Sequence, residues 1–194
     1  MKRPVVHGPP IASRVLLIGQ APGPREGKLG RPFAWTAGKT LFQWLHAATG
    51  ANEAKIRNCV YIAAIARCFP GKLPKTKKGP NKGKSNGDRR PDQKEIAACK
   101  PWLAREVEIL EPELVIAVGT LAIEQVLGEK LKLEEIVGRV VRARYFGREV
   151  DVLALPHPSG ASPWHKVDPG KTLLARALDK LRHHDTMRDA VRSV

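Results

Sequence analysis

The chain has 194 residues, of which 42% are hydrophobic, and this length and composition are typical of one globular domain with a substantial buried core. Lysine and arginine outnumber the acidic residues by 34 to 19, so the net charge of +15 predicts a polyanionic partner such as a nucleic acid. No apolar run approaches the length of a membrane span, and residues 1–10 lack the apolar segment of a secretory signal, so we expect a cytoplasmic protein with no membrane partner. Three cysteines are a sparse and odd set, which argues against a disulfide framework and suits a reducing compartment.

The first part of the chain predicts a strand, a long loop and a helix. Residues 1–13 are polar and rich in proline, and we expect them to form an amino-terminal arm. Residues 15–18 predict a short buried strand, because an apolar run of this length between turn-forming residues is too short for a helix. A loop rich in glycine and proline continues to Trp35, and apolar periodicity then predicts a helix over 37–48 that ends at Gly50. Ligands of open α/β sheets bind beyond the carboxyl ends of strands, so this first loop is a candidate binding site.

Strands and helices continue to alternate along the rest of the chain. Residues 71–91 interrupt the pattern with eight basic residues, one acidic residue and no apolar periodicity, which predicts an exposed basic loop. The other predicted elements are a strand over 60–65, a helix that begins at Asp92 with a capping box to Glu95, a strand over 114–118, a helix over 121–127, strands over 139–146 and 150–155 separated by a turn at 147–149, and a helix that begins after Asp168. This order predicts the α/β class: a single domain over residues 1–194 with three layers, α/β/α, and a mainly parallel central sheet.

A second loop punctuated by proline and glycine, PHPSGASPWHK, follows the strand that ends at Leu155. The first loop reads GQAPGPREGKLGRPFAWTAGKTL, and together the two loops resemble those of the uracil-DNA glycosylase superfamily, most closely its family 4. The first motif of that family has the form GEAPGxxEDxxGRPFxGxAGxLL, and the resemblance extends over roughly residues 14–181. It implies a uracil-DNA glycosylase-like fold and a DNA repair enzyme. Such an enzyme flips uracil out of single- or double-stranded DNA and removes it by hydrolysis, which initiates base excision repair.

The resemblance assigns base-binding roles in the first loop and the second strand. It places Phe33 where the flipped uracil stacks, Glu26 where a side chain crowds the C5 edge of the base and discourages thymine, and Ala21 and Ala64 beside the base. Taken alone, Phe33 would be a packed core residue and Glu26 a solvated acid. A pocket for an extruded base needs a stacking aromatic and polar groups at the base edge, which favours the first interpretation.

His157 is the strongest candidate for a catalytic residue. Breaking the N-glycosidic bond leaves an oxocarbenium-like sugar and an anionic base, and an imidazole that donates to the base oxygen stabilises the developing charge. A lone histidine has a structural role about as often, but packing poorly explains a histidine between two prolines at the end of a strand. Gln20 is the second candidate, since its amide can orient a water by hydrogen bonding although it cannot act as a base.

The second loop and the basic loop supply the candidate DNA-binding residues. We expect Ser159 and Gly160 to hold DNA phosphate and Lys166 to contact phosphate nearby. Trp164 is expected to wedge into the gap left by the flipped base, with a role as a core aromatic as the alternative. For the basic loop, binding along a phosphate backbone and a solvated charge run are equal alternatives, and its candidates are Lys77, Lys78, Lys82 and Lys84.

Three departures from the family motif bear on the chemistry. Gln20 replaces a glutamate and Gly27 replaces an aspartate, so two acids are missing. Ala64 stands where the family reads uracil with an asparagine, so base reading falls on the backbone, on Gln20, or on Asn81 or Asn86 of the basic loop. This loss admits hypoxanthine or xanthine as the substrate base. It also admits a protein that binds uracil or abasic sites in DNA with weak turnover, and a basic RNA-binding domain is a further alternative.

The cysteines also depart from the family pattern. Family 4 binds a 4Fe–4S cluster through four cysteines, of which Cys68 and Cys99 match two. Cys59 matches neither of the other two, and four thiolates are the usual requirement for such a cluster. We therefore predict no metal and no cofactor, and we expect a monomer.

Overall fold

The computed structural model describes residues 1–74, 87–160 and 163–194. At their centre lies a five-stranded sheet with the strand order β2-β1-β3-β5-β4. The strands are β1 (Val15–Gly19), β2 (Tyr61–Ala64), β3 (Leu114–Val118), β4 (Val140–Tyr145) and β5 (Arg148–Leu155). Four strands are parallel, and β4 at one edge pairs antiparallel with β5, so the sheet is mainly parallel as predicted.

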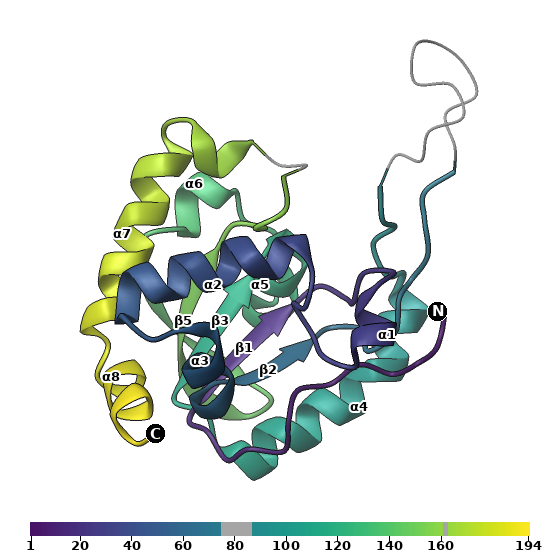
Figure 1. Ribbon diagram of the computed structural model, residues 1–194, viewed down its shortest axis with the longest axis horizontal. Helices are drawn as coiled ribbons and strands as arrows, with labels where there is room; N and C mark the ends of the chain where they lie inside the picture. The colour runs from purple at the N-terminus through teal and green to yellow at the C-terminus, as the bar shows by residue number, and fades with distance from the viewer. Residues whose placement is uncertain (75–86, 161–162) are drawn as a thin grey trace.

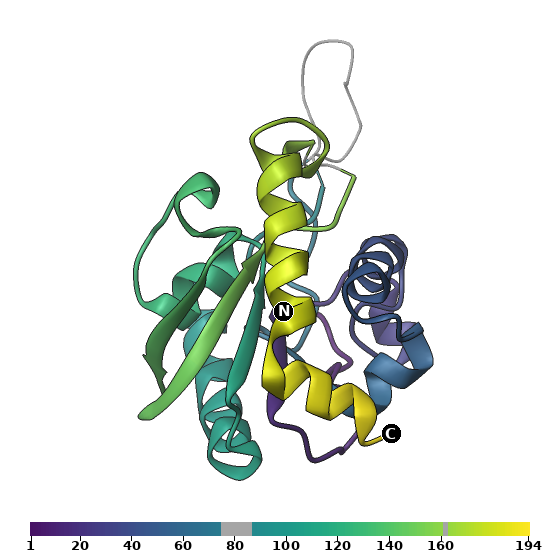
Figure 2. The same ribbon diagram turned by 90° about the vertical axis from the view of Figure 1, so that its left-hand side faces the viewer.

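Helices cover both faces of this sheet (Figures 1 and 2). One face carries α2 (Thr36–Thr49), α3 (Glu53–Cys59), α7 (Gly170–His183) and α8 (Asp185–Arg192), and the other carries α4 (Gln93–Leu110) and α5 (Thr120–Leu127). Shorter helical segments are α1 (Glu26–Leu29), α6 (Leu133–Ile136) and the 3-10 helix η1 (Trp164–Lys166). The arrangement confirms the predicted three-layer α/β/α fold. No helix among the described residues is long and apolar enough to cross a membrane.

Strand β1 lies in the middle of the sheet and organises the core. Leu17 pairs with Ile62 of β2 on one side and with Ile116 of β3 on the other. Residues 15–18 are fully buried, and burial of each large apolar side chain stabilises the fold by about 1.5–3 kcal/mol. Burial on both faces explains why this strand is a continuous apolar run without alternation. Strands β2 and β3 flank β1 on opposite sides. In such an open sheet, a crevice forms at the carboxyl ends of the strands.

Helix α2 agrees closely with the sequence prediction. It begins and ends one residue beyond the predicted range 37–48 at each end. Gly50 follows with a φ of 74°, a left-handed conformation that suits glycine and stops the helix. The apolar face that the periodicity predicts is buried against the sheet and consists of Leu41, Phe42, Leu45 and Ala48.

The hairpin between β4 and β5 is tighter than predicted. Tyr145 pairs with Arg148, so the turn consists of Phe146 and Gly147. The prediction of a turn at 147–149 is wrong at both ends, because Phe146 belongs to the turn and residues 148–149 belong to β5. Both turn residues have positive φ, 46° and 84°, which is the geometry of a two-residue hairpin turn. A phenylalanine rarely adopts such a conformation, and its ring here packs on Tyr145 at a centroid distance of 4.6 Å.

The amino-terminal arm is packed against the segment that follows β2. The Lys2 N–H donates to the Phe69 carbonyl oxygen, and the Val6 N–H donates to the Arg67 carbonyl oxygen, each at 2.7 Å. The Val6 side chain is buried. The arm therefore belongs to the folded domain and borders the segment that leads into the basic loop.

Candidate active site

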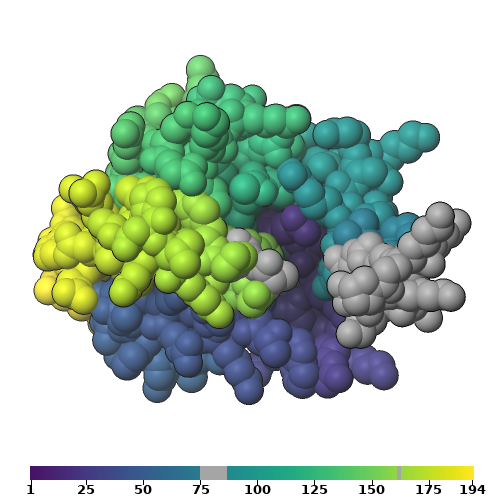
Figure 3. All heavy atoms as spheres, turned by 90° about the horizontal axis from the view of Figure 1, so that it is seen from above, coloured from purple at the N-terminus to yellow at the C-terminus, as the bar shows by residue number. Residues whose placement is uncertain are grey.

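A cavity of about 380 Å³ opens at the carboxyl ends of β1 and β2, within the size range of small-molecule sites. Residues 19–26, 32–33 and 35–37 contribute most of its lining from the first loop, and His157 and Ser159 contribute from the second. Figure 3 looks onto this edge of the molecule, and the amino-terminal segment in purple lies at the bottom of a hollow between the green and teal segments. The two loops that the sequence singles out therefore meet at one site.

Phe33 lines this cavity in a backbone conformation that the surrounding glycines make possible. Its φ is 52°, a left-handed value that is rare for an aromatic residue. A Cβ on Gly19 would lie 2.6 Å from Phe33 Cζ, and a Cβ on Gly38 would lie 1.7 Å from the Phe33 carbonyl oxygen. Only glycine fits at these two positions, so the glycines of the motif hold the phenyl ring against the end of β1.

Arg57 of α3 holds the turn that carries Phe33, and no sequence pattern pointed to it. Its Nη1 donates to the Pro32 carbonyl oxygen at 3.0 Å, and its Nη2 donates to the Phe33 carbonyl oxygen at 3.1 Å. Its Nε donates to Glu53 at 2.8 Å, and its guanidinium lies 4.4 Å from the centroid of the Phe42 ring. Burial lowers the pKa of Arg57, and the Glu53 carboxylate opposes that effect. The paired guanidinium fixes the turn from behind the cavity.

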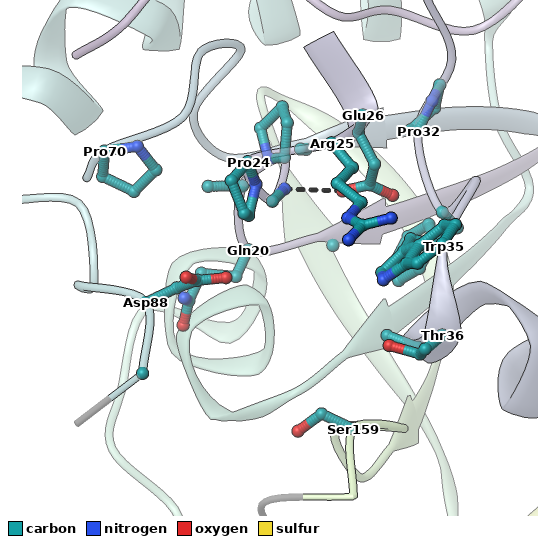
Figure 4. A pocket seen from close by; sticks show the side chains of 18 of the residues that line it. Gln20, Pro24, Arg25, Glu26, Pro32, Trp35, Thr36, Pro70, Asp88 and Ser159 are labelled. Carbon is teal, nitrogen blue, oxygen red and sulfur yellow. Dashed lines mark hydrogen bonds between the residues drawn. The ribbon is translucent and has the colours of Figure 1, made fainter. Parts of the chain in front are cut away.

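Glu26 closes the first loop on itself. Its Oε2 accepts a hydrogen bond from the Gly23 N–H at 2.6 Å (Figure 4). Its Oε1 accepts one from the Ala34 N–H at 2.9 Å. Both carboxylate oxygens thus bind backbone, and Glu26 is not the solvated acid that was the simpler interpretation. The residue lines the cavity, and its effect on thymine stays a prediction.

The ring of His157 is held in one tautomer by Ser159. The Ser159 backbone N–H donates to His157 Nδ1 at 3.2 Å, and the Ser159 hydroxyl oxygen lies 2.9 Å from the same nitrogen. Because Nδ1 accepts, we assign the proton of the neutral imidazole to Nε2. Gly119, with a φ of 86°, leaves room for the ring, since a Cβ there would lie 3.1 Å from His157 Cδ2.

The electrostatics of His157 suit a neutral hydrogen-bond donor. Burial lowers the pKa of His157, and the negative charge of Asp88 opposes that effect. The ring is therefore neutral at physiological pH, with Nε2–H available to a ligand in the cavity. Such a donor stabilises an oxyanion on a departing group without transferring a proton.

Gln20, Ala21 and Ala64 also line the cavity, as the resemblance implied. The Gln20 backbone carbonyl accepts from the Ala66 N–H at 3.0 Å, which ties the start of the first loop to the end of β2. Ala64 pairs with Gly19 across the two strands and presents no polar side-chain atom. Backbone and Gln20 thus lie where a base could be read, whereas Asn81 and Asn86 lie outside the described residues.

The predicted DNA-binding residues do not form one group. Ser159 lines the cavity, whereas Gly160, Trp164 and Lys166 are not among its lining residues. The Trp164 indole N–H donates to Glu134 at 2.8 Å, and the ring packs so closely on α7 that a Cβ on Gly170 would lie 2.7 Å from it. This packing agrees with the alternative of a packed aromatic, and a wedge role stays a prediction. The four lysines of the basic loop, Lys77, Lys78, Lys82 and Lys84, lie outside the described residues.

The lining also includes residues that the sequence did not single out, among them Arg25, Trp35 and Asp88. The Arg25 guanidinium lies 4.2 Å from the centroid of the Trp35 ring, and 44% of Trp35 is exposed beside the cavity (Figure 4). Trp35 stands where the family motif has a glycine, which was a usable signal. Asp88 is the single acid of the basic loop. One acid among eight basic residues indicates a specific role for that position, which the net charge of the loop does not reveal.

The cysteines do not fit an iron–sulfur cluster. Cys68 and Cys99 are both buried, and the Arg67 backbone N–H donates to Cys99 Sγ at 3.4 Å. Burial raises the pKa of the Cys68 thiol, and the proximity of Cys99 raises it further, so the thiol form is favoured over the thiolate that a metal needs. In the described part of the chain, no group of three or more histidine, cysteine, aspartate or glutamate side chains could hold a metal ion. Cys59 lies on α3 instead.

Comparison with known proteins gives a consistent result. The family model described as the Uracil DNA glycosylase superfamily matches residues 5–182. A type-4 uracil-DNA glycosylase of Sulfurisphaera tokodaii is 30% identical over 153 residues, which cover 77% of this chain and 61% of that protein. Pyrobaculum aerophilum has a type-4 uracil-DNA glycosylase that is 30% identical over 149 residues, covering 75% of this chain and 66% of that protein.

A type-5 uracil-DNA glycosylase of Pyrobaculum aerophilum is also 30% identical, over 173 residues that cover 81% of this chain and 66% of that protein. The matched part thus spans 61% to 66% of the length of these three relatives. These matches confirm the resemblance carried by the two loops.

Proposed function

Because the chain belongs to the uracil DNA glycosylase superfamily, we propose that it is a monofunctional uracil-DNA glycosylase that initiates base excision repair. One observation carries the proposal: a neutral His157 with its proton on Nε2 lines the same cavity as the aromatic ring of Phe33. The type-4 and type-5 uracil-DNA glycosylases among its relatives support the same activity. We infer that the partner is single- or double-stranded DNA and that the protein acts in the cytoplasm as a monomer, without metal or cofactor.

The proposed reaction begins when uracil leaves the base stack and enters the cavity. Phe33 offers a face on which the base stacks, and the first loop brings backbone groups to the base edge. As the bond from C1′ of the sugar to N1 of the base breaks, its electron pair goes to the base. His157 Nε2–H donates a hydrogen bond to the base oxygen and so stabilises the anion. Water then bonds to C1′ and completes the hydrolysis.

A second candidate function follows from Ala64. Its methyl group cannot distinguish uracil from other bases by hydrogen bonding, so deaminated purines such as hypoxanthine or xanthine are the alternative substrates. A protein that binds uracil or abasic sites in DNA with weak turnover is the non-enzymatic alternative. The three possibilities differ in which base, if any, is released.

An oligonucleotide panel separates these functions. Single- and double-stranded oligonucleotides that carry uracil, hypoxanthine, xanthine or thymine are incubated with the protein and then cleaved with alkali at abasic sites. We expect cleavage at uracil and none at thymine. Cleavage only at hypoxanthine or xanthine would support the purine alternative, and tight binding without any release would contradict the enzymatic proposal.

A further inference from the structure

Of the described residues that line the cavity, two are acids, Glu26 and Asp88. Glu26 uses both carboxylate oxygens on backbone N–H groups and is thereby committed to the loop. Gln20 cannot accept a proton from water, and Gly27 has no side chain. We propose that Asp88 is the carboxylate that orients and deprotonates the attacking water. This inference rests on the proposed glycosylase function and assigns the base that the first loop lacks.

The backbone around Asp88 is fixed by pairing at the base of the basic loop. Residues 71–73 lie antiparallel to residues 87–89, joined by backbone hydrogen bonds of 3.0 and 2.8 Å. Lys72 and Asp88 form the bridge between the two segments. Asp88 thus stands on a short stem whose two segments are paired through their backbones.

Arg89 anchors this stem to the domain. Its Nη2 donates to the Pro70 carbonyl oxygen and to Glu95 Oε1, each at 2.6 Å. Glu95 in turn belongs to the capping box that starts α4. Arg89 therefore pairs with Glu95, whereas the ion-pair partner of Asp88 is Lys72.

The Asp88 side chain faces the cavity. A Cβ on Gly23 would lie 3.7 Å from Asp88 Oδ2 and 3.5 Å from Glu26 Oε2, so both carboxylates face this glycine. Asp88 Oδ1 pairs with Lys72 Nζ at 2.7 Å, and 39% of the Asp88 side chain is exposed, so water reaches it. Figure 4 shows Asp88 on the same side of the cavity as Gln20, whose amide can donate and accept hydrogen bonds.

Asp88 and His157 would stabilise opposite charges in the proposed reaction. The negative charge of Asp88 acts on His157 within the cavity, where it opposes the lowering of the His157 pKa by burial. In the proposed reaction, positive charge develops on the sugar and negative charge on the base. A carboxylate stabilises the first and an N–H donor stabilises the second, so the cavity holds a suitable group for each.

The proposed step balances as follows. The water oxygen bonds to C1′, the bond from C1′ to the base breaks, and its electron pair leaves with the base. One water proton passes to Asp88 and from there to solvent, while the released base takes a proton from solvent. Within the described part of the chain, the titratable and charged groups that face Asp88 are Lys72 on the stem, Glu26 across Gly23 and His157 in the second loop.

The pH dependence of single-turnover release from a uracil oligonucleotide tests this role. In the unchanged protein, we expect the rate to fall at low pH, because a protonated carboxyl group cannot accept a proton from water. Asp88→Asn is expected to lower the rate about 100-fold or more at neutral pH and to remove this acidic limb, because an amide does not titrate. Asp88→Glu is expected to restore part of the rate together with the acidic limb.

Two matched variants separate catalysis from structure. Lys72→Ala breaks the same ion pair but keeps the carboxylate, so it should retain the acidic limb. Asp189→Asn on the exposed surface of α8 makes the same change in net charge and should leave the rate unchanged. The inference is overturned if Asp88→Asn keeps the rate of the unchanged protein, or if Asp88→Asn and Lys72→Ala lose equal rate and both keep the acidic limb. Absence of release by the unchanged protein from every oligonucleotide of the panel would instead overturn the glycosylase function.

Discussion

At the scale of single residues, the site depends on which atoms are already bound to backbone and which face the cavity. Nδ1 of His157 accepts a hydrogen bond from the Ser159 N–H, which leaves Nε2–H for a ligand. Both carboxylate oxygens of Glu26 accept hydrogen bonds from backbone N–H groups of the first loop. The motif identified both residues, but their partners decide what each can do. A carboxylate that accepts two backbone hydrogen bonds stabilises the loop, and an imidazole with Nδ1 held in a hydrogen bond presents its Nε2–H in a fixed direction.

The role of His157 can be measured directly. His157→Ala is expected to lower single-turnover base release by about 100- to 1,000-fold, because an aimed oxyanion donor is lost. DNA affinity should stay nearly unchanged, since the imidazole acts on charge that develops only during bond breakage. His183→Ala, at an exposed position on α7, serves as the control and should leave both quantities unchanged. Equal losses in binding and rate would make His157 a structural residue.

At the scale of elements, the start of α4 connects the sheet, the arm and the stem that carries Asp88. Glu95 completes the capping box with Asp92, pairs with Arg89 at 2.6 Å and lies 3.2 Å from the amino-terminal nitrogen of Met1. Hydrogen bonding from Arg89 is the main cause that lowers the pKa of Glu95, to about 2. The ionised Glu95 therefore stabilises the folded state.

This linkage predicts a pH-dependent stability. The folded-state pKa of about 2 lies below the ordinary value of 4.5, so the stabilisation by Glu95 is complete above pH 4.5 and is lost as the pH falls toward 2. Glu95→Gln is expected to lower the midpoint of thermal unfolding at pH 7 by about 2–4 °C, the shift that ~1 kcal/mol produces in a protein of this size. The difference between the two proteins should shrink as the pH decreases from 4.5 to 2.

Glu108→Gln on the same helix is the control for this experiment. Glu108 is 67% exposed and pairs only with the exposed Arg105 among the described residues, so its loss should have little effect at any pH. A constant difference between Glu95→Gln and the unchanged protein across this pH range would contradict the linkage.

The elements that sequence reasoning found are those whose signals are local. The apolar run of β1, the periodicity of α2 and the capping box of α4 each follow from a few neighbouring residues. Helix α3 is too short for a clear periodicity, although Asn52 caps it by accepting from the Lys55 N–H at 2.9 Å. Helix α8 has apolar residues at helical spacing, Met187, Ala190 and Val191, but with eight residues it is too short for a clear periodicity. Such helices are stabilised by tertiary contacts, which a local pattern does not contain.

The candidate site was predictable where a motif fixes the backbone. Gly19 and Gly38 are in the motif because any side chain would collide with Phe33, so sequence and geometry agree. Arg57 and Asp88 were missed because they reach the site from α3 and from the stem of the basic loop. Their side chains meet the first loop only after the chain has folded, and no spacing in the sequence encodes that meeting.

At the scale of the whole molecule, the net charge of +15 favours binding to DNA before any base is recognised. Neutralising Lys77, Lys78, Lys82 and Lys84 together is expected to flatten the dependence of DNA affinity on salt, by up to about 0.9 in the logarithmic slope for each lysine that contacts phosphate of duplex DNA. Fluorescence anisotropy of a labelled oligonucleotide at several salt concentrations gives this slope.

A second quadruple variant controls for net charge. Lys55, Lys100, Lys130 and Lys180 do not line the cavity, and their neutralisation removes the same number of charges. We expect this variant to keep a steeper slope than the basic-loop variant. Equal slopes in the two variants would show that the basic loop contributes only bulk charge.

The hydrogen bonds that Glu26 makes within the first loop have a consequence for how the proposed glycosylase would search DNA. Since hydrogen bonds from the Gly23 and Ala34 N–H groups to Glu26 hold the loop together within the folded chain, its ordering entropy is lost during folding and not at the encounter with a base. A preformed pocket can bind a nucleotide that flips out of the duplex spontaneously, without a conformational change of the protein. Protein that slides along DNA would then encounter extruded bases at the rate at which they leave the duplex. The lifetime of the extruded state would limit how often a base is bound.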